Sequence, residues 1–363
     1  MASPDENGDA ICESNCVFSF CDKDFEFDAD PWLADDNAFH LSKFDVKLQQ
    51  AWDNACSVGA FWYDLSNVER KKITGTFGLY AQLNTKRFAQ RRKPEESTKV
   101  VMPFNDAKFN FTKIKEKEVL FTMKDNDSEN REANHKLIIN VSPIEYGHVL
   151  LVPNVDMKLP QTLDKEAVKL AAQVCLLSKH RGLRLGFNSL CALASVNHQH
   201  LHAFYINHQL PIDKVKFQER KGGLLILENY MVRGYAVQLD EDVDFFASQV
   251  SLITDYFCQN NIAHNLFMCR GRRASSAQNA PRDGSTVTAF IFPKHPCSAI
   301  TDHPFNVAFL ELGGFLPIRD KDQYDSITED QAVKLLNRYT FREEEFDQLT
   351  HKLTDLLKQM LPS

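Results

Sequence analysis

The sequence of 363 residues contains no apolar run approaching the roughly 18 residues that a membrane-spanning helix needs. Its first ten residues, MASPDENGDA, are acidic and lack the basic start and apolar centre of a secretory signal. The nine cysteines form no CxxC pair, and Cys12, Cys16 and Cys21 have no fourth ligand at a spacing suited to zinc. These absences predict a cytosolic protein with reduced thiols and no membrane partner.

The chain also has no excess of basic over acidic residues. The formal net charge is -7 and the isoelectric point is near 6.0, which argues against a nucleic-acid partner, because broad nucleic-acid binding needs a basic surface. Hydrophobic residues make up 43% and charged residues 25% of the chain, as in ordinary globular proteins. We therefore expect a globular protein whose ligands are small molecules. Nothing in the sequence identifies a protein partner.

Composition and periodicity divide the chain into three parts. The first 36 residues contain eleven acidic side chains and one lysine, so we expect residues 1–42 to be an acidic, poorly ordered arm. We expect residues 43–325 to form the main domain, in two halves at about 60–215 and 216–325. Residues 326–363 read as two helical pieces that pack on this domain.

Each half repeats the same order of elements. In the first half, two strands at 136–141 and 148–152 precede a helix that Thr162 can cap, and two further strands follow. In the second half, strands near 223–227 and 235–239 precede a helix over 243–260. Strands near 265–269 and 287–292 complete that half. The two halves show no repeat at the level of individual residues.

Three of the twelve histidines occupy alternate positions in the segment SVNHQHLHAFYI, which begins at Ser195. The valine, phenylalanine, tyrosine and isoleucine around them favour a β-strand. Side chains two residues apart lie on one face of a strand, roughly 7 Å from one another. We therefore expect His198, His200 and His202 to line one face.

Four roles compete for this row of imidazoles. A single histidine would favour a structural role, but three on one face do not. Zinc sites usually include or are oriented by a carboxylate, and no Asp or Glu occurs between Glu166 and Asp213, which disfavours a metal. General acid–base catalysis without a covalent step is the third role. In the fourth, the middle histidine is a nucleophile towards phosphorus, flanked by the other two.

Neighbouring residues favour the nucleophilic role. The segment GFNSLCALASV supplies Asn188 and Ser195, two neutral donors suited to phosphate oxygens. His148 opens its own strand after SPIEYG and is a fourth imidazole that could join the same face. Each of these residues alone has an ordinary structural explanation, whereas their clustering indicates a phosphate site.

Six segments resemble a known family: AQLNTKRFAQRRKPE, MPFNDAKFNFTKIKEKEVLF, VSPIEYGHVLLVP, NHQHLHAFYI, NIAHNLFMCRG and AFLELGGFLPI. Together they are similar to the GDP-hexose phosphorylases of the histidine-triad superfamily, a group that includes the plant GDP-L-galactose phosphorylases. The third histidine makes the chain most similar to the animal members, which act on GDP-glucose. The resemblance spans roughly residues 60–345.

This resemblance implies an α+β fold of the histidine-triad and galactose-1-phosphate uridylyltransferase type, with two related halves, an antiparallel sheet and flanking helices. It implies phosphorolysis of GDP-glucose by inorganic phosphate to GDP and glucose 1-phosphate, with no metal or other cofactor. Carried onto this sequence, His200 becomes guanylylated, and His198 and His202 flank it. Asn188, Ser195 and His148 then surround the phosphates.

The uridylyltransferase branch of the superfamily has glutamine at the position of His202. A sugar phosphate, whose second pKa is about 6, leaves readily as an anion, so a hydrogen bond from either side chain suffices. The site must also favour phosphate over water, and we expect some of Arg87, Arg91 and Arg270 to hold it.

Two rival functions remain open. A hydrolase of nucleoside diphosphate-sugars or cap-like nucleotides, from the same superfamily, would not need inorganic phosphate. A catalytically idle nucleotide-binding module would not need a nucleophilic histidine.

Overall fold

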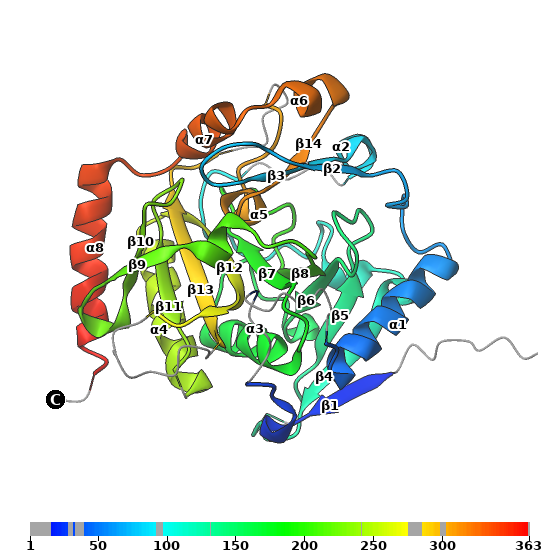
Figure 1. Cartoon of the computed structure of the whole chain (residues 1–363). Helices are drawn as coiled ribbons and strands as arrows, with labels where there is room; N and C mark the ends of the chain where they lie inside the picture. The colour runs from blue at the N-terminus through cyan, green and yellow to red at the C-terminus, as the bar shows by residue number, and fades with distance from the viewer. Residues whose placement is uncertain are drawn as a thin grey trace, which may run out of the picture.

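An eleven-stranded sheet runs through the whole molecule (Figure 1). The computed structural model describes residues 16–27, 32, 40–91, 97–130, 132–240, 242–274, 285–297 and 303–361. Across the sheet the strands are β1 (Val17–Phe20), β4 (Val119–Asp125), β5 (His135–Ile139), β6 (Val149–Val152), β8 (Leu201–Tyr205), β7 (Leu183–Asn188), β12 (Ala263–Arg272), β13 (Ser285–Lys294), β11 (Tyr235–Gln238), β10 (Leu225–Glu228) and β9 (Lys216–Glu219).

The sheet consists of two halves with the same topology. In chain order the first half is β5, β6, α3 (Lys165–Leu177), β7 and β8, and the second is β10, β11, α4 (Val243–Gln259), β12 and β13. The strands lie in the order β5-β6-β8-β7 and β10-β11-β13-β12, and antiparallel pairing of β7 with β12 joins the halves. The predicted α+β fold with two related halves is confirmed.

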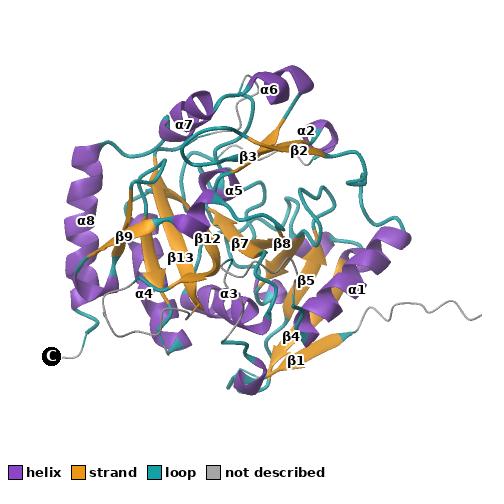
Figure 2. Ribbon diagram, in the orientation of Figure 1, coloured by secondary structure: helices purple, strands orange, loops and turns teal. Residues whose placement is uncertain are grey.

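Helices cover one face of this sheet and a smaller sheet lies over the other (Figures 1 and 2). The first face carries α1 (Lys43–Ser57), α3, α4 and α8 (Glu343–Lys358), which share the larger apolar core with it. The second layer contains β2 (Glu69–Lys72), β3 (Tyr80–Leu83), β14 (Phe315–Ile318), α2 (Thr85–Gln90), α5 (Phe309–Leu312), α6 (Lys321–Ser326) and α7 (Glu329–Asn337).

Short 3-10 helices complete the described elements: η1 (Asp22–Asp24), η2 (Phe111–Lys113), η3 (Glu116–Glu118), η4 (Val155–Met157), η5 (Pro211–Lys214) and η6 (Lys221–Gly223). Among the residues that the structure describes, no helix combines the length and the apolar character needed to cross a bilayer.

The helices start close to where their sequences predict, with one change of cap. The side chain of Asp164, not that of Thr162, accepts the hydrogen bond from the Ala167 N–H at the start of α3, at 2.9 Å. This fits the cap rule, because the accepting side chain lies three residues before the N–H that it binds. The capping box of Thr328 and Gln331 at the start of α7 is present.

Part of the N-terminal arm departs from expectation. Residues 17–20 form β1, which pairs in parallel with β4 at the edge of the large sheet. The aromatic side chains of this segment explain the ordering: Phe20 is buried in the main core, and Phe18 packs edge-on against Phe44 of α1 with ring centroids 5.6 Å apart. The first fifteen residues lie outside the described part of the chain.

A buried carboxylate ties α1 to the rest of the first half. Asp45 is 0% exposed. One oxygen accepts hydrogen bonds from the Ser42 N–H and the Lys179 N–H, both at 2.9 Å. The other accepts from the Ser178 hydroxyl at 2.6 Å and the Tyr205 hydroxyl at 2.9 Å. Asp45 thereby joins the start of α1, the end of α3 and the end of β8.

We expect Asp45→Ala to lower the free energy of unfolding by about 3 kcal/mol, because it leaves several buried donors without an acceptor. Asp53→Ala is the matched control on the same helix, since Asp53 is exposed and binds only the Tyr146 hydroxyl among described residues. Chemical denaturation measures both. A loss for Asp45→Ala no larger than that for Asp53→Ala would contradict this role.

Candidate active site

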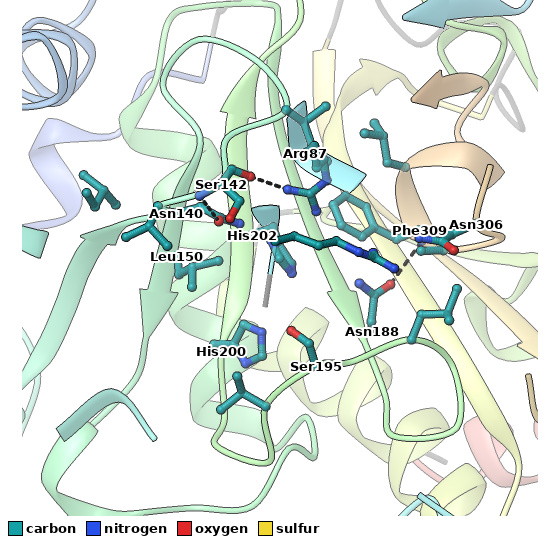
Figure 3. Close-up of a pocket in the computed structure, with 18 of the residues that line it drawn as sticks. Arg87, Asn140, Ser142, Leu150, Asn188, Ser195, His200, His202, Asn306 and Phe309 are labelled. Carbon is teal, nitrogen blue, oxygen red and sulfur yellow. Dashed lines mark hydrogen bonds between the residues drawn. The ribbon is translucent and has the colours of Figure 1, made fainter. Parts of the chain in front are cut away.

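A cavity between the large sheet and the layer of α2 and α5 holds most of the predicted site residues (Figure 3). It contains about 1070 Å³ of empty space, its open mouth included. The lining includes six of the nine predicted residues: Arg87, Arg91, Asn188, Ser195, His200 and His202.

The backbone at His200 is held from outside the sheet. Gln161, 1% exposed, accepts a hydrogen bond from the His200 N–H at 3.0 Å and donates one to the His200 carbonyl at 3.1 Å. The Gln199 N–H donates to the Leu159 carbonyl at 2.9 Å. Because the segment before α3 binds these groups, sheet pairing starts at Leu201, and β8 is shorter than the predicted histidine strand.

The ring of His200 has a defined tautomer. Its Nδ1 lies 2.7 Å from the carbonyl oxygen of His198. A carbonyl oxygen only accepts, so Nδ1 carries the ring proton and Nε2 carries the lone pair. Burial lowers the pKa of His200 to about 4, so the ring is neutral at pH 7. A neutral imidazole with a free lone pair in a cavity is a competent nucleophile.

The ring of His198 is not part of the cavity lining. It is 0% exposed and packs against Phe104 and Phe111, with centroid distances of 5.2 and 5.4 Å. Its Nδ1 accepts a hydrogen bond from the Phe111 N–H at 3.1 Å. The prediction that three imidazoles share one face is therefore corrected, because alternation holds only within a strand and, of the three, only His202 lies in β8. His198 contributes its carbonyl group to the site.

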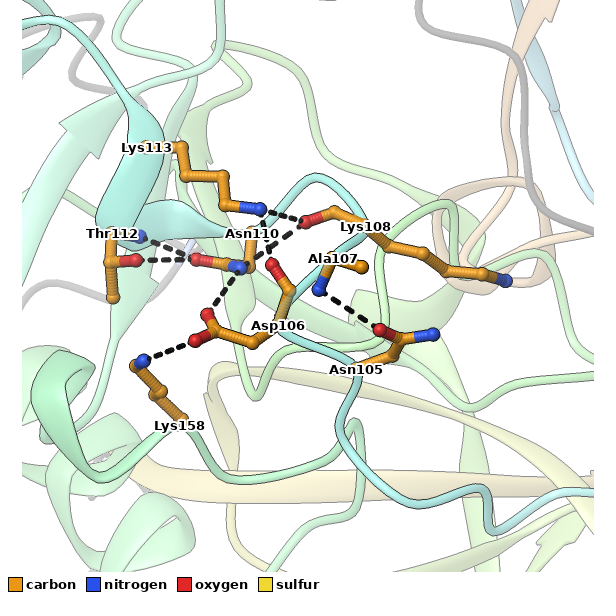
Figure 4. A network of polar contacts seen from close by, with 8 residues as sticks. All are labelled: Asn105, Asp106, Ala107, Lys108, Asn110, Thr112, Lys113 and Lys158. Carbon is orange, nitrogen blue, oxygen red and sulfur yellow. Dashed lines mark hydrogen bonds and ion pairs between the residues drawn. The ribbon is translucent and has the colours of Figure 1, made fainter.

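A polar network fixes the loop that holds His198 (Figure 4). Asn110, 1% exposed, accepts a hydrogen bond from the N–H two residues later at 3.1 Å and donates to the Lys108 carbonyl at 3.3 Å. Asp106 pairs with Lys158 at 2.8 Å. The residue after Asn110 supplies the N–H that binds His198, so this network also fixes the His198 carbonyl.

A second chain of hydrogen bonds sets the proton on His202. The Ile144 N–H donates to Nδ1 of His148 at 2.9 Å, so the proton of neutral His148 is on Nε2. That Nε2 lies 3.1 Å from both Nδ1 of His202 and Nδ2 of Asn140, and an amide nitrogen cannot accept a hydrogen bond. His148 therefore donates to Nδ1 of His202, which leaves the proton of His202 on Nε2. Burial, and next the neighbouring histidine, hold both pKa values well below the ordinary one. His148 orients His202 and does not line the cavity.

Phe309 brings the second half of the chain into the site. Its N–H donates to Oδ1 of Asn188 at 3.1 Å, and its ring stacks on His202 with centroids 5.5 Å apart. The ring lies so close to Gly186 that a Cβ there would overlap it. Asn265 also donates to Oδ1 of Asn188, at 2.7 Å. Since that oxygen is engaged, the NH2 group of Asn188 is what remains for a ligand.

Arginine side chains crowd one end of the cavity. Arg87 of α2 donates to the Ser142 carbonyl, and Arg91 directly follows the helix. Burial, followed by the charges of Arg87 and Arg319, lowers the pKa of Arg91 to about 10. Guanidinium groups this close repel one another unless an anion lies among them, so this end suits phosphate. Arg92 and Lys93 lie outside the described residues.

The side chain of Arg270 does not line the cavity. It is 8% exposed, and its Nε and Nη2 each lie 2.9 Å from a carbonyl oxygen, those of Cys175 and Leu176 in the last turn of α3. Carbonyls at the end of a helix lack partners within it, so a guanidinium there satisfies them. Arg270 therefore lies against α3 on the helix-covered face, and we remove it from the candidate site.

The other end of the cavity is apolar. Its floor belongs to a small cluster that includes Phe111, Ile138, Leu150 and Val196. Figure 3 places Leu150 on one side of His202 and Asn306, which accepts a hydrogen bond from Arg319 at 2.9 Å, on the other. The cavity thus offers an apolar slot, a pair of neutral histidines and a cationic end.

Glu311 is a buried carboxyl group in the same lining. It is 5% exposed, and its Oε2 accepts a hydrogen bond from the Ala308 N–H at 3.1 Å. Burial raises the pKa of Glu311 to about 7, although the nearby charge of Arg87 opposes that shift. Glu311 therefore titrates near neutral pH beside the cationic end.

Sequence reasoning missed Gln161, Asn110, Phe309 and Glu311. Gln161 belongs to no motif, and only the fold brings it to His200. The other three lie in segments that carry the family resemblance. The sequence therefore marked these segments, but it did not indicate what the individual residues do. Within the described part of the chain, no three His, Cys, Asp or Glu side chains are grouped as metal ligands.

Two family models match this chain, one over each half. The GDPGP1-like N-terminal domain matches residues 43–204 and the GDPGP1-like C-terminal domain matches residues 206–360. The chain is 36% identical over 321 residues to GDP-D-glucose phosphorylase 1 of Danio rerio, covering 87% of this chain and 92% of the relative. It is 34% identical over 327 residues to GDP-L-galactose phosphorylase 2 of Arabidopsis thaliana, covering 84% and 74%.

Among solved structures, yeast Ap4A phosphorylase Apa2 in complex with Ap4A matches with a TM-score of 0.58 and 15% identity, covering 84% of this chain and 99% of that chain. This likeness shows the shared fold, an α+β protein of two related halves. The chain belongs to the GDPGP1-like family, which confirms the resemblance predicted from its sequence motifs.

We expect the pH dependence of stability to change in Glu311→Gln. The pKa of Glu311 rises from its ordinary 4.5 to about 7 on folding, so the folded state binds the proton more tightly than the unfolded state. The free energy of unfolding of the wild type therefore falls as the pH rises from about 4.5 to about 7. The unfolding free energy of the variant relative to wild type should increase by about 2–3 kcal/mol between pH 5 and pH 8.

Urea denaturation at several pH values measures this difference. Glu344→Gln, on the exposed face of α8, is the control and should follow the wild-type profile. Parallel profiles for wild type and Glu311→Gln would show that the carboxyl group is not shifted.

Proposed function

We propose that this chain is a GDP-glucose phosphorylase, which splits GDP-glucose with inorganic phosphate into GDP and glucose 1-phosphate. One observation carries the proposal: His200 is neutral, has its lone pair on Nε2, and lines a cavity with one apolar and one cationic end. The relatives named GDP-D-glucose phosphorylase 1, at 36% and 38% identity in Danio rerio and Bos taurus, support the choice of substrate.

In the first step, Nε2 of His200 attacks the α-phosphorus of GDP-glucose. An N–P bond forms, the bond from the α-phosphorus to the bridging oxygen breaks, and glucose 1-phosphate leaves as an anion. We assign the Nε2–H of His202, whose ring centroid lies 5.3 Å from that of His200, as the hydrogen-bond donor to that bridging oxygen. No full proton transfer is required, because the second pKa of a sugar phosphate is about 6.

In the second step, an oxygen of orthophosphate attacks the guanylyl phosphorus and the N–P bond breaks. GDP forms, and His200 regains its lone pair on Nε2 because Nδ1 keeps its proton on the His198 carbonyl. The NH2 of Asn188 and the Ser195 hydroxyl, which Figure 3 shows near His200, can bind the α-phosphate oxygens in both steps. No metal ion or cofactor is part of this scheme.

In the second step, orthophosphate must react with the guanylyl-histidine in preference to water. Arg87 and Arg91 lie in the lining at the crowded cationic end, and this supports a role in holding orthophosphate for in-line attack. A hydrolase of nucleoside diphosphate-sugars or cap-like nucleotides would release GMP without phosphate, and an idle binding module would release nothing. Incubating a panel of nucleotide sugars with and without phosphate, and identifying the products, separates the three.

We also infer a cytosolic location. The cysteines among the described residues are all free thiols, which supports a reducing compartment. GDP-glucose and phosphate are the proposed partners, and no nucleic acid or membrane is required.

We expect His200→Asn to lose more than about 10³-fold in turnover, because it removes the nucleophile. It should also accumulate no protein-bound label from GDP-glucose labelled at the α-phosphorus. Quenched samples run under denaturing conditions measure the label. His208→Asn is the control, because His208 stacks on Tyr80 and does not line the cavity. Labelled His200→Asn protein would place the nucleophile elsewhere.

We expect Arg87→Ala to lower the ratio of phosphorolysis to hydrolysis by about 10-fold or more, since charge-assisted hydrogen bonds to phosphate are lost. Lys86→Ala, the adjacent residue on α2, pairs with Asp64 at the surface and should keep the wild-type ratio. Counting GDP against GMP as products gives the ratio. If Arg87→Ala keeps the wild-type ratio, Arg87 does not hold orthophosphate.

A further inference from the structure

The apolar end of the cavity contains one carboxylate. Two glutamates line the cavity among the described residues, Glu118 and Glu311. Glu311 is at the cationic end, where its Oε2 accepts from Ala308 and Arg87 lies nearby. Glu118 instead directly precedes Val119, which packs on the apolar cluster that forms the cavity floor.

Local structure holds Glu118 in place. It is the last residue of η3, and its Oε1 accepts a hydrogen bond from the Lys115 N–H, at the start of the same helix, at 3.3 Å. This is the one hydrogen bond to the side chain of Glu118 within the described part of the chain. The second carboxylate oxygen and the remaining lone pair of the first are therefore available to a ligand in the slot.

A nucleobase is the part of the proposed substrate that fits the apolar end, because its flat ring needs apolar and aromatic contacts such as Phe111 and Ile138. The bases differ in what their edges offer a carboxylate. Guanine presents two adjacent donors, N1–H and the N2 amino group, which match the two oxygens of one carboxylate. Adenine presents an acceptor at N1 in the same place, so a carboxylate there opposes adenine.

We propose that Glu118 recognises the guanine ring, accepting hydrogen bonds from N1–H and the N2 amino group, and thereby selects guanine over adenine. This role rests on the proposed function, because it concerns the base of the same substrate. Positive selection of guanine and rejection of adenine arise from one group, since the carboxylate has no proton to offer adenine N1.

The test compares Glu118→Gln with wild type on three substrates: GDP-glucose, ADP-glucose and IDP-glucose, whose hypoxanthine base lacks the N2 amino group. For GDP-glucose we expect kcat/KM to fall about 10- to 100-fold, mainly through KM, because charge-assisted hydrogen bonds are lost. For IDP-glucose the fall should be smaller, since wild type makes one bond fewer. For ADP-glucose kcat/KM should stay the same or rise.

Glu116→Gln is the matched control. Glu116 lies in the same 3-10 helix, is exposed and does not line the cavity, so its substitution should keep the wild-type preference. Glu118→Asp is the second variant. It keeps the negative charge on a side chain that is one methylene group shorter. Glu118→Asp should retain part of the guanine preference, which the loss of the hydrogen bond to the Lys115 N–H alone would not explain.

An unchanged ratio of GDP-glucose to ADP-glucose in folded Glu118→Gln would overturn the proposal. So would an equal fall for all three substrates, because that result would assign Glu118 to the loop structure alone. Failure of the proposed function is a different outcome: wild-type protein would then form no product that depends on inorganic phosphate from GDP-glucose.

Discussion

The hydrogen bond between Nδ1 of His200 and the His198 carbonyl is the constraint on which the site depends. It assigns the ring proton to Nδ1 and so leaves the lone pair on the opposite nitrogen. Two sets of contacts hold it in place. Gln161 binds both backbone groups of His200, and the loop around Asn110 fixes His198 through the Phe111 N–H. The nucleophile is thus oriented by backbone geometry, and its neutrality comes from burial.

The fold explains why one cavity suits the two ends of a nucleotide sugar. The first half supplies the histidines and the apolar slot, from the segments around β5, β6 and β8. Phe309 and Glu311 come from the second half, and Phe309 reaches His202 only because Gly186 has no side chain. Arg87 comes from the segment before β4. The site therefore exists only when all these segments are assembled, which agrees with family profiles that cover both halves.

Sequence alone predicted the larger elements well, because α3 and α4 have clear helical periodicity and the core strands are rich in branched apolar residues. It predicted the residues of the histidine row but not their arrangement. Alternation assumed a strand through His198, whereas Gln161 takes the backbone groups that a neighbouring strand would have bound. Arg270 was misplaced for a related reason: its charge is visible in the sequence, but the face of β12 on which it lies is not.

The central claim is that the Nε2 atom of His200 bonds to the α-phosphorus. The most direct measurement mixes wild-type protein with GDP-glucose in the absence of phosphate, quenches in base and maps the modified peptide by mass spectrometry. Phosphorus NMR of the same peptide then distinguishes the two ring nitrogens. The account predicts GMP on Nε2 of His200, released as GDP when phosphate is added before the quench. GMP on another residue, on Nδ1, or on no residue would contradict it.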